Sequence, residues 1–306
     1  MNDTIIEING LTKKFGSLTA VDNLDLKVYK GDIFGFLGPN GAGKSTTIRM
    51  LLSLIKPTSG SIRIFGLSVK RDRKNIMRRI GAIVEKPDFY LYLTAYKNLE
   101  ILGRLSGADV SKNKIMGMLE LVGLASRHNS KVKTFSHGMK QRLGLAQALL
   151  HDPELIILDE PTTGLDPQGM KEIRELILYL SRSKGKTIFL SSHILHEVEM
   201  IANRMIIINK GKKIVEGNVA DLLRSDKMNV SFEVSDPLKA SDIIKEIAEG
   251  GEFQPGSNKI TLSLTQKEVS ELNKKLVESG IEVYSIVPVR SLEEYFLKIT
   301  EGANND

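Results

Sequence analysis

The sequence predicts an α/β protein built on a parallel β-sheet, followed by a smaller α+β domain. The first observation is a set of short, continuously apolar runs, such as 33–37 and 155–158, which are typical of strands buried on both faces. The second is that these runs alternate with helical segments, as in a parallel sheet with crossover helices. The third is a glycine-rich turn between one such strand and a helix, which indicates a phosphate-binding site.

The glycine-rich turn spans residues 38–46 and contains the pattern G-x-x-x-x-G-K-[ST]. Glycines allow backbone conformations that a Cβ would block, so successive N–H groups can turn inward around an anion. Lys44 is expected to reach the β- and γ-phosphates, and Ser45 to ligate Mg²⁺. A purely structural turn is the alternative, but the strand and helix that the pattern requires are both predicted here. The residues expected to bind the nucleotide here are Gly38, Pro39, Asn40, Gly41, Ala42, Gly43, Lys44, Ser45 and Thr46.

The 306 residues include 43 basic and 37 acidic side chains, a net charge of +6. This small excess does not indicate a nucleic-acid partner. A basic cluster at 70–79 is best interpreted as the solvated face of a short helix, with contact to anionic lipids or a membrane partner as the alternative. The absence of cysteine excludes disulfides and thiolate metal sites. With no apolar run of about 18 residues and no signal peptide, a cytoplasmic location is expected.

The elements before the helical region are expected to be mostly strands. An antiparallel sheet is predicted at 5–8 and 24–28, where apolar and polar residues alternate. Phe15 is expected in the loop between these strands, either packed in the core or stacked on a base. Further strands are predicted at 62–65 and 80–84.

Residues 86–152 have helical periodicity and are interpreted as a helical insertion. The parallel sheet is expected to resume after it. The elements predicted there are strands at 155–158, 187–190 and 205–208, a return strand at 214–215, and helices at 170–183, 194–202 and 219–224.

Chemically reactive side chains follow three of these strands, namely Glu85, the pair Asp159 and Glu160, and His193. Ligands of open α/β sheets bind at the carboxyl ends of the strands, so one nucleotide triphosphate could contact all of them. Asp159 is expected to hold Mg²⁺ directly or through water, and Glu160 to orient or deprotonate an attacking water. The natural role for His193 is a hydrogen bond to the γ-phosphate. The alternatives are that the acids cap the next helix and that the histidine is structural.

A second candidate phosphate contact lies at 135–142, just before a helix predicted at 143–150. Ser136 is a good N-cap residue, which is the structural interpretation. A helix N-terminus with a glycine beside the cap can also bind phosphate. Since this segment belongs to the helical insertion, it need not contact the nucleotide held by its own chain.

The domain boundary is expected near 225, giving residues 1–225 and 226–306. Strands at 228–234, near 252–254, at 259–264 and at 281–287 enclose helices at 238–249 and 266–279. This β-α-β-β-α-β order is ferredoxin-like. A final helix is predicted at 291–299, before a frayed tail at 302–306. No catalytic group is evident in this domain, which is interpreted as an accessory or dimerisation domain.

These motifs, in this order, resemble the nucleotide-binding subunit of an ABC transporter over residues 4–225. The resemblance assigns Walker A to 38–46, the Q-loop position to Glu85, the signature to 135–139, Walker B to 155–160, the D-loop to 164–166 and the switch to His193. It implies a P-loop NTPase (ABC ATPase) core with an antiparallel β subdomain and a helical subdomain at about 86–152.

The resemblance also implies that two copies close head to tail over two ATP molecules. Each ATP would lie between one phosphate-binding turn and the signature of the other copy, where Ser136 and Gly138 bind the γ-phosphate. Phe15 matches the aromatic residue that stacks on adenine, Glu160 the residue that polarises the hydrolytic water, and Asp166 a contact across the dimer. The dimer would drive a separate membrane permease, docked through 85–98 on the inner face of the membrane.

Two departures from the family pattern narrow the resemblance. Glu85 stands where glutamine is usual, and the signature reads F-S-H-G-M in place of L-S-G-G-Q. Both are similar to the bacitracin-resistance and lantibiotic-immunity exporters, which implies export of a peptide antibiotic or another hydrophobic compound. The carboxylate of Glu85 can still ligate Mg²⁺ but adds negative charge beside the triphosphate. The alternative is a soluble ABC-type ATPase acting on a macromolecular complex, which usually has two nucleotide domains, a coiled-coil insertion or zinc-binding cysteines.

Overall fold

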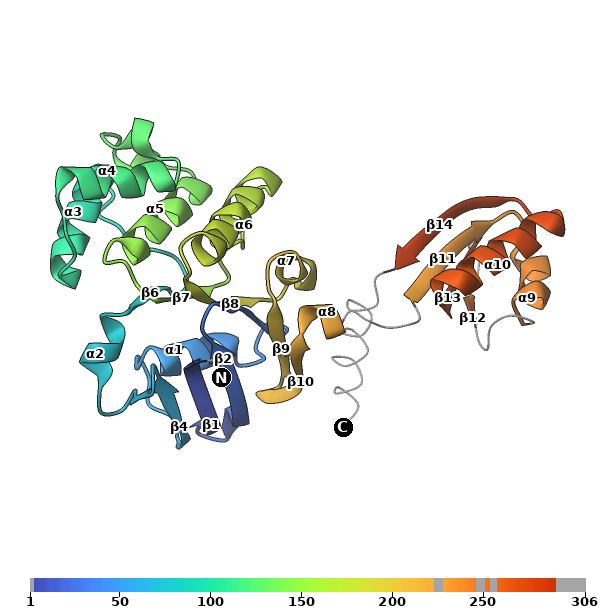
Figure 1. Cartoon of the computed structure of the whole chain (residues 1–306), viewed down its shortest axis with the longest axis horizontal. Helices are drawn as coiled ribbons and strands as arrows, with labels where there is room; N and C mark the ends of the chain where they lie inside the picture. Colours follow the sequence, from blue (N-terminus) through green and yellow to red (C-terminus); the bar gives the residue numbers. More distant parts are fainter. Residues whose placement is uncertain (1–2, 223–227, 246–250, 254–257, 290–306) are drawn as a thin grey trace. The chain divides into compact units, whose positions relative to one another are not determined.

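The computed structural model describes residues 3–222, 228–245, 251–253 and 258–289, and it divides into two compact units, Met1–Val219 and Ala220–Asp306 (Figure 1). The boundary expected near 225 falls among 223–227, outside the described residues. No helix in the part of the chain that the structure describes is both long and apolar enough to cross a membrane.

The first unit is organised around a six-stranded sheet with the order β10-β9-β3-β8-β7-β6. All neighbours in it pair in parallel except β9 and β10, which form a hairpin. Every residue of β3, β7 and β8 is buried, which confirms that the continuous apolar runs are strands covered on both faces. The strands are β3 (Ile33–Leu37), β6 (Ile80–Ile83), β7 (Leu155–Asp159), β8 (Thr187–Ser192), β9 (Arg204–Asn209) and β10 (Lys212–Asn218).

An antiparallel sheet with the order β2-β1-β4-β5 forms a second layer. Its strands are β1 (Thr4–Phe15), β2 (Leu18–Tyr29), β4 (Ser59–Ile64) and β5 (Leu67–Ser68). β1 and β2 are much longer than predicted, and Phe15 is the last residue of β1, so its placement in a loop was wrong. Register shifts along the β1–β2 pair interrupt the simple alternation of buried and exposed residues, which hid the full length of both strands.

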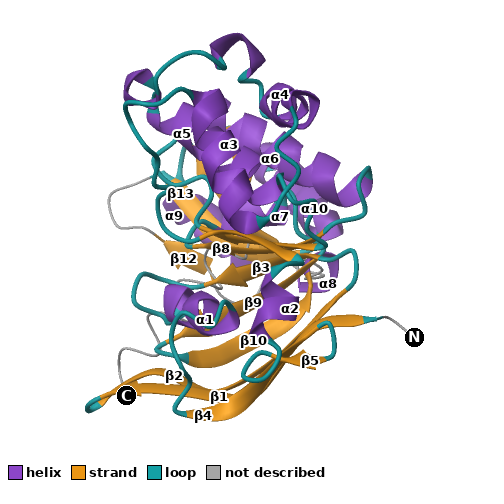
Figure 2. Cartoon of the chain, turned by 90° about the vertical axis from the view of Figure 1, so that its left-hand side faces the viewer, coloured by secondary structure: helices purple, strands orange, loops and turns teal. Residues whose placement is uncertain are grey.

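Two helices, α1 (Lys44–Leu51) and α2 (Arg73–Met77), lie between the two sheets (Figure 2). Buried residues from both sheets and both helices form one hydrophobic core. Ile48 of α1 and Ile76 of α2 are completely buried in it. This packing holds the start of α1 against the carboxyl end of β3, and therefore fixes the position of the glycine-rich turn.

The opposite side of the six-stranded sheet carries the helical region (Figure 1). Its helices are α3 (Ala95–Ser106), α4 (Lys112–Leu121) and α5 (His137–Leu149), with short 3₁₀ turns at Ala125–Arg127 and Val132–Thr134. α5 begins six residues before the predicted start at 143 because Ser136 caps it and its polar first turn remains helical. α6 (Pro167–Arg182) likewise begins earlier than predicted, with Pro167 in its first turn, whereas α7 (Leu195–Glu199) ends earlier. α8 (Val219–Leu222) ends the described part of this segment.

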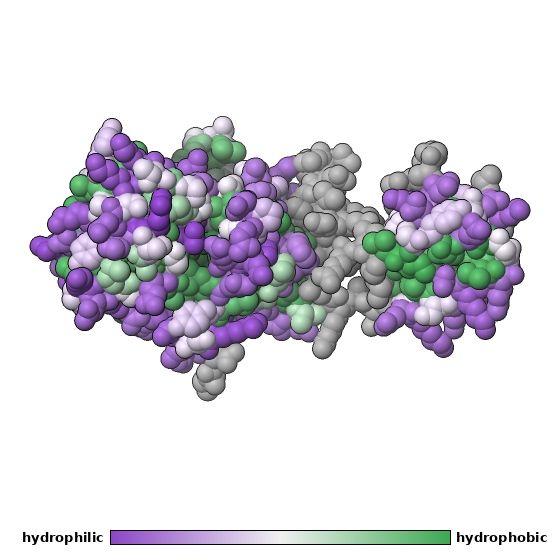
Figure 3. Space-filling model, turned by 90° about the horizontal axis from the view of Figure 1, so that it is seen from above, coloured by the Kyte–Doolittle hydropathy of each residue, from purple (hydrophilic) through white to green (hydrophobic). Residues whose placement is uncertain are grey.

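The second unit contains the predicted β-α-β-β-α-β order. Its elements are β11 (Met228–Val234), α9 (Pro237–Lys245), β12 (Gly251–Phe253), β13 (Lys259–Leu264), α10 (Gln266–Glu278) and β14 (Val283–Val289). The antiparallel strand order β12-β13-β11-β14 is that of a ferredoxin-like sheet. One face of this unit carries a band of hydrophobic residues (Figure 3), and its exposed large apolar side chains include Val277, Tyr284 and Val287. The helix predicted at 291–299 and the tail at 302–306 lie outside the described residues.

Candidate nucleotide site

The glycine-rich turn joins β3 to α1 and has the backbone shape that a phosphate cradle needs. Gly41 and Gly43 have φ values of 81° and 106°, in the left-handed region that side chains disfavour. A Cβ on Gly43 would lie 2.4 Å from the carbonyl oxygen of Ala20, so neighbouring backbone also requires a glycine there. The first intrahelical bond of α1 runs from the Thr47 N–H to the Gly43 oxygen, at 2.9 Å. None of the described hydrogen bonds uses the N–H groups of Lys44, Ser45 or Thr46, so these groups can bind an anion.

Lys44 is the cation of this turn, and only 5% of it is exposed. Its Nζ donates hydrogen bonds to the carbonyl oxygens of Gly38, at 2.7 Å, and Pro39, at 3.2 Å. The same Nζ lies 3.3 Å from Oε1 of Glu160. The buried ammonium is thus held by three oxygens at the edge of the sheet.

Asp159 and Glu160 lie at the carboxyl end of β7, where a serine of the neighbouring strand fixes both. The hydroxyl of Ser191 donates to Oδ1 of Asp159, with 2.5 Å between the oxygens. The same hydroxyl accepts a hydrogen bond from the backbone N–H of Glu160, at 3.0 Å. Glu160 has a φ of 48°, a left-handed conformation that is costly for a side-chain-bearing residue and that tends to be retained at functional sites.

The carboxylate of Glu160 receives hydrogen bonds from two further side chains. Thr163 Oγ1 donates to Oε2 at 3.0 Å, and Nδ1 of His193 lies 3.1 Å from the same oxygen. Because a carboxylate oxygen only accepts, Nδ1 of His193 carries the hydrogen. Burial alone would raise the pKa of Glu160, but the hydrogen bond from Thr163 and the charges of Lys44 and His193 outweigh it and lower the pKa. Glu160 is therefore ionised at neutral pH, as a general base must be.

Glu85 lies after β6 and is placed differently from the other strand-end residues. It has a φ of 61°, and its carboxylate pairs with the guanidinium of Arg49 on α1. Its side chain is 60% exposed. Among the described contacts, none joins Glu85 to Asp159 or Glu160. The structure therefore brings together Lys44, Asp159, Glu160 and His193, and leaves Glu85 beside them.

The donor set fits a triphosphate with Mg²⁺. The hydroxyl of Ser45 on the first turn of α1 and the carboxylate of Asp159 are hard oxygen ligands. No cluster of three or more His, Cys, Asp or Glu side chains with metal-binding geometry occurs among the described residues. Mg²⁺ does not need one, since one or two protein oxygens and the phosphates suffice.

The other predicted nucleotide contacts lie at helix starts and strand ends of the same unit. Ser136 Oγ accepts the Met139 N–H at 3.2 Å and caps α5, while Asp166 Oδ1 accepts the Gly169 N–H at 2.9 Å and caps α6. Ser136, Gly138 and Asp166 line a cavity of about 310 Å³, and no described contact joins them to residues 38–46. Phe15 is 49% exposed at the end of β1.

Comparison with known proteins identifies the family. A profile described as ABC transporter matches residues 21–163. The chain is 48% identical over 303 residues to the bacitracin transport ATP-binding protein BcrA of Bacillus licheniformis, covering 98% of each chain. It is 44% identical over 212 residues to the lantibiotic transport ATP-binding protein SrtF of Streptococcus pyogenes, covering 69% of this chain and 90% of that one. The chain belongs to the ABC transporter ATP-binding family.

A solved ABC structure supports the same fold. It is a dimeric ATP-binding cassette in a post-hydrolysis state with ADP and phosphate bound. It superposes on this chain with a TM-score of 0.64 at 26% sequence identity, and the match covers 70% of this chain and 99% of the solved chain. The first unit is thus an ABC ATPase core, with the antiparallel sheet and the helical region as its subdomains.

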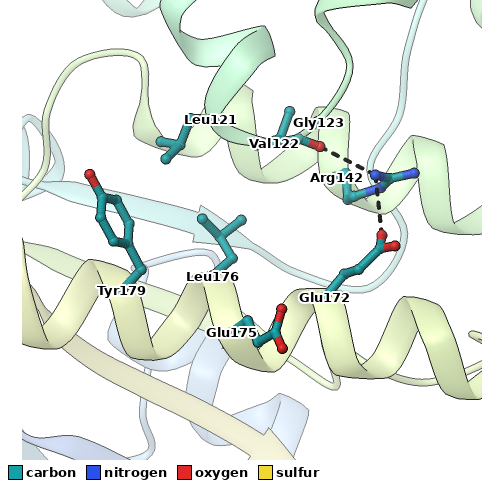
Figure 4. Close-up of a pocket in the computed structure, with 8 residues that line it drawn as sticks. All are labelled: Leu121, Val122, Gly123, Arg142, Glu172, Glu175, Leu176 and Tyr179. Carbon is teal, nitrogen blue, oxygen red and sulfur yellow. Dashed lines mark hydrogen bonds and ion pairs between the residues drawn. The ribbon is translucent and has the colours of Figure 1, made fainter.

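In this ABC subunit, Arg142 of the signature helix α5 joins the helical subdomain to α6 (Figure 4). Its guanidinium lies 3.2 Å from a carboxylate oxygen of Glu172 and 3.5 Å from the carbonyl oxygen of Val122. A cavity of about 480 Å³ lies alongside, bordered by Leu176 and Tyr179. None of its lining residues is a predicted nucleotide contact, so we assign it no role in ATP binding.

Three side chains that contact the ABC site residues were missed in the sequence. Ser191 fixes both acids, Thr163 bonds to Glu160, and Arg49 pairs with Glu85. The signal for Ser191 was its place at the end of an apolar strand, two residues before His193. Thr163 and Arg49 offered no pattern, because their contacts depend on how separate segments meet.

Proposed function

We propose that the ATP chemistry of the family is performed here by the residues that meet at the sheet edge. The turn 38–46 binds the phosphates of ATP, with Lys44 leaving Glu160 to reach them. Ser45 and Asp159 would hold Mg²⁺, which would supply positive charge to neutralise the phosphates. Glu160 takes a proton from the attacking water, and His193 contacts the γ-phosphate. Glu85, which pairs with Arg49, would be a further carboxylate ligand of Mg²⁺.

The active form that we propose is a head-to-tail dimer of two copies. The observation that supports it is the separation of Ser136 and Gly138 from the phosphate-binding turn of their own chain. At their exposed helix N-terminus, none of the described hydrogen bonds uses the N–H groups of His137 and Gly138, which suit the γ-phosphate of a second copy. Phe15, which is half exposed at the end of β1, would stack on adenine, and Asp166 would contact the other copy. ATP, by bridging both copies, would shift the population toward the closed dimer.

The physiological role that we propose is to power export of a peptide antibiotic through a separate membrane permease. The support is the resemblance to bacitracin and lantibiotic transport proteins, which extends over nearly the whole chain in the first case. The subunit would sit on the cytoplasmic face of the membrane and dock through 85–98, where Tyr90 and Tyr92 are exposed. These relatives do not favour the alternative of a soluble ATPase acting on a macromolecular complex.

The experiment is to purify the tagged native chain from its own host membranes and identify what accompanies it. We expect a multi-spanning membrane protein to co-purify, and deletion of the gene to sensitise the host to bacitracin or lantibiotic peptides. A chain that stays entirely in the soluble fraction while the permease is present, with unchanged sensitivity after deletion, would refute the transport role.

A further inference from the structure

The two carboxylate oxygens of Glu160 have different surroundings. Oε2 is bonded by both Thr163 and His193, whereas Oε1 lies 3.3 Å from Lys44. If Lys44 moves to the phosphates, Oε1 becomes the oxygen that faces the attacking water. The two donors on Oε2 then fix the rotation of the carboxylate and aim Oε1.

Thr163 is itself held by the signature segment of the same chain. Nε2 of His137 lies 3.3 Å from the backbone oxygen of Thr163, and since a carbonyl only accepts, this nitrogen carries the hydrogen. The ring of His137 also packs on Gly164, where a Cβ would come within 3.5 Å of it. His137 lies between Ser136 and Gly138, the residues proposed to read the nucleotide of the other copy. A single hydrogen-bonded path therefore runs from His137 through Thr163 to Glu160.

We infer that Thr163 is a positioning residue for the catalytic base, and that His137 couples it to the nucleotide bound by the chain's own signature. This inference rests on the proposed function. His137 and Thr163 are exposed in the single chain, beside the cavity lined by Ser136 and Asp166, on the surface that a second copy would cover. The signature of one chain contacts the ATP bound by the other copy, whereas Glu160 of that same chain acts on the ATP bound by its own turn. Contact at the first ATP would thus align the base at the second. Hydrolysis at the two sites would then be cooperative.

The first test replaces Thr163 in the full-length chain and measures ATP hydrolysis at saturating Mg²⁺. Thr163→Val removes the hydroxyl at nearly constant volume and should lower kcat about tenfold, while KM for ATP stays within about twofold. Thr163→Ser keeps the hydroxyl and should restore most of kcat. A wild-type kcat in Thr163→Val, or an equally low kcat in Thr163→Ser, would overturn the positioning role.

The second test addresses the coupling. His137→Ala should lower kcat about fivefold and bring the Hill coefficient for ATP close to 1, whereas His137→Gln, whose amide can donate to the same carbonyl, should restore both. The double variant His137→Ala/Thr163→Val should be no slower than Thr163→Val alone, because both changes break one path. Effects that multiply would overturn the coupling.

Two controls separate this inference from the proposed function. His128→Ala is the first control, because Nδ1 of His128 also lies close to a backbone carbonyl, 2.9 Å from the oxygen of Ala125. His128 belongs to the helical subdomain and is not a site residue. We therefore expect kcat to stay unchanged. Glu160→Gln tests the base itself. Full hydrolysis by Glu160→Gln would refute the proposed base, whereas loss of hydrolysis with a normal Thr163→Val would refute only the positioning role.

Discussion

The ammonium of Lys44 and the carboxylate of Glu160 lie 3.3 Å apart, so the proposed phosphate-binding cation and the proposed base neutralise each other in the nucleotide-free chain. Only 5% of the lysine side chain and 25% of the glutamate side chain are exposed, which limits screening by water. If Lys44 binds the phosphates as proposed, ATP competes with Glu160 for this lysine. Binding of the phosphates and release of the base become one event.

This competition predicts that Glu160→Gln binds ATP more tightly than the wild type. Removing the carboxylate frees Lys44 and removes a negative charge near the phosphates, so Kd should fall about threefold to tenfold, equivalent to about 1 kcal/mol. Calorimetric titration with Mg²⁺ and ATP measures it. Glu175→Gln, an exposed change on α6, is the matched control and should leave Kd unaltered. A weaker affinity of Glu160→Gln would contradict the competition.

Ser191→Ala should damage both activity and stability. The hydroxyl is buried, and its loss leaves Oδ1 of Asp159 and the N–H of Glu160 without their described partner. We expect a cost of about 1–3 kcal/mol in the free energy of unfolding, with kcat lowered about tenfold. Denaturant unfolding and steady-state ATPase assays measure the two effects, with Ser106→Ala on the helical subdomain as the control. Unchanged stability would argue against the bridging role of Ser191.

Glu85→Gln should alter transport coupling more than ATP affinity. The change keeps the shape of the side chain but removes the ion pair with Arg49, which links β6 to α1. We expect Kd for ATP to stay within about twofold, because this exposed pair contributes little to binding. The ratio of peptide exported to ATP hydrolysed, measured with the permease in vesicles, should change. Equal resistance with an unchanged ATPase rate would count against this expectation.

The pair of Arg79 and Glu154 should make stability depend on acid pH. Hydrogen bonds from Arg79 at 2.6 and 2.9 Å lower the pKa of Glu154, so its contribution is present above the unfolded-state pKa and is lost as the pH falls through the folded-state pKa. Since both side chains are more than a third exposed, we expect about 0.2–1 kcal/mol. Thermal unfolding should give Glu154→Gln a lower Tm than the wild type at pH 7, and this difference should disappear near pH 3. A Tm difference that persists at pH 3 would mean that the variant loses side-chain packing and not the ion pair.

Much of the geometry of the candidate site could be predicted because each part is a local pattern. The turn 38–46 lies between a strand and a helix, and Asp159, Glu160 and His193 each follow an apolar run. Parallel strands place their carboxyl ends at one edge, so the convergence of these side chains follows from the fold class alone.

The remaining contacts depend on pairing between distant segments. Ser191 reaches Asp159 because the two are register partners on β7 and β8, 32 positions apart in the chain. The pairing of Glu85 with Arg49 depends on how α1 lies beside the end of β6. Phe15 and the start of α5 were misplaced for a different reason, namely bulges and a polar first turn that mask the periodicity of the elements.

The central claim is that each chain supplies only half of an ATP site, which the signature of a second copy completes. Its most direct test is the molar mass of Glu160→Gln with Mg²⁺ and ATP, measured by light scattering during size exclusion. We expect a dimer, and a monomer when Gly138→Asp is added, because its charge would repel the γ-phosphate of the other copy. A Cβ at Gly138 meets only Leu165 Cδ2, at 3.7 Å, so the fold tolerates the start of this side chain. A Glu160→Gln chain that stays monomeric in saturating ATP, or dimerises equally well with Gly138→Asp, would contradict the account.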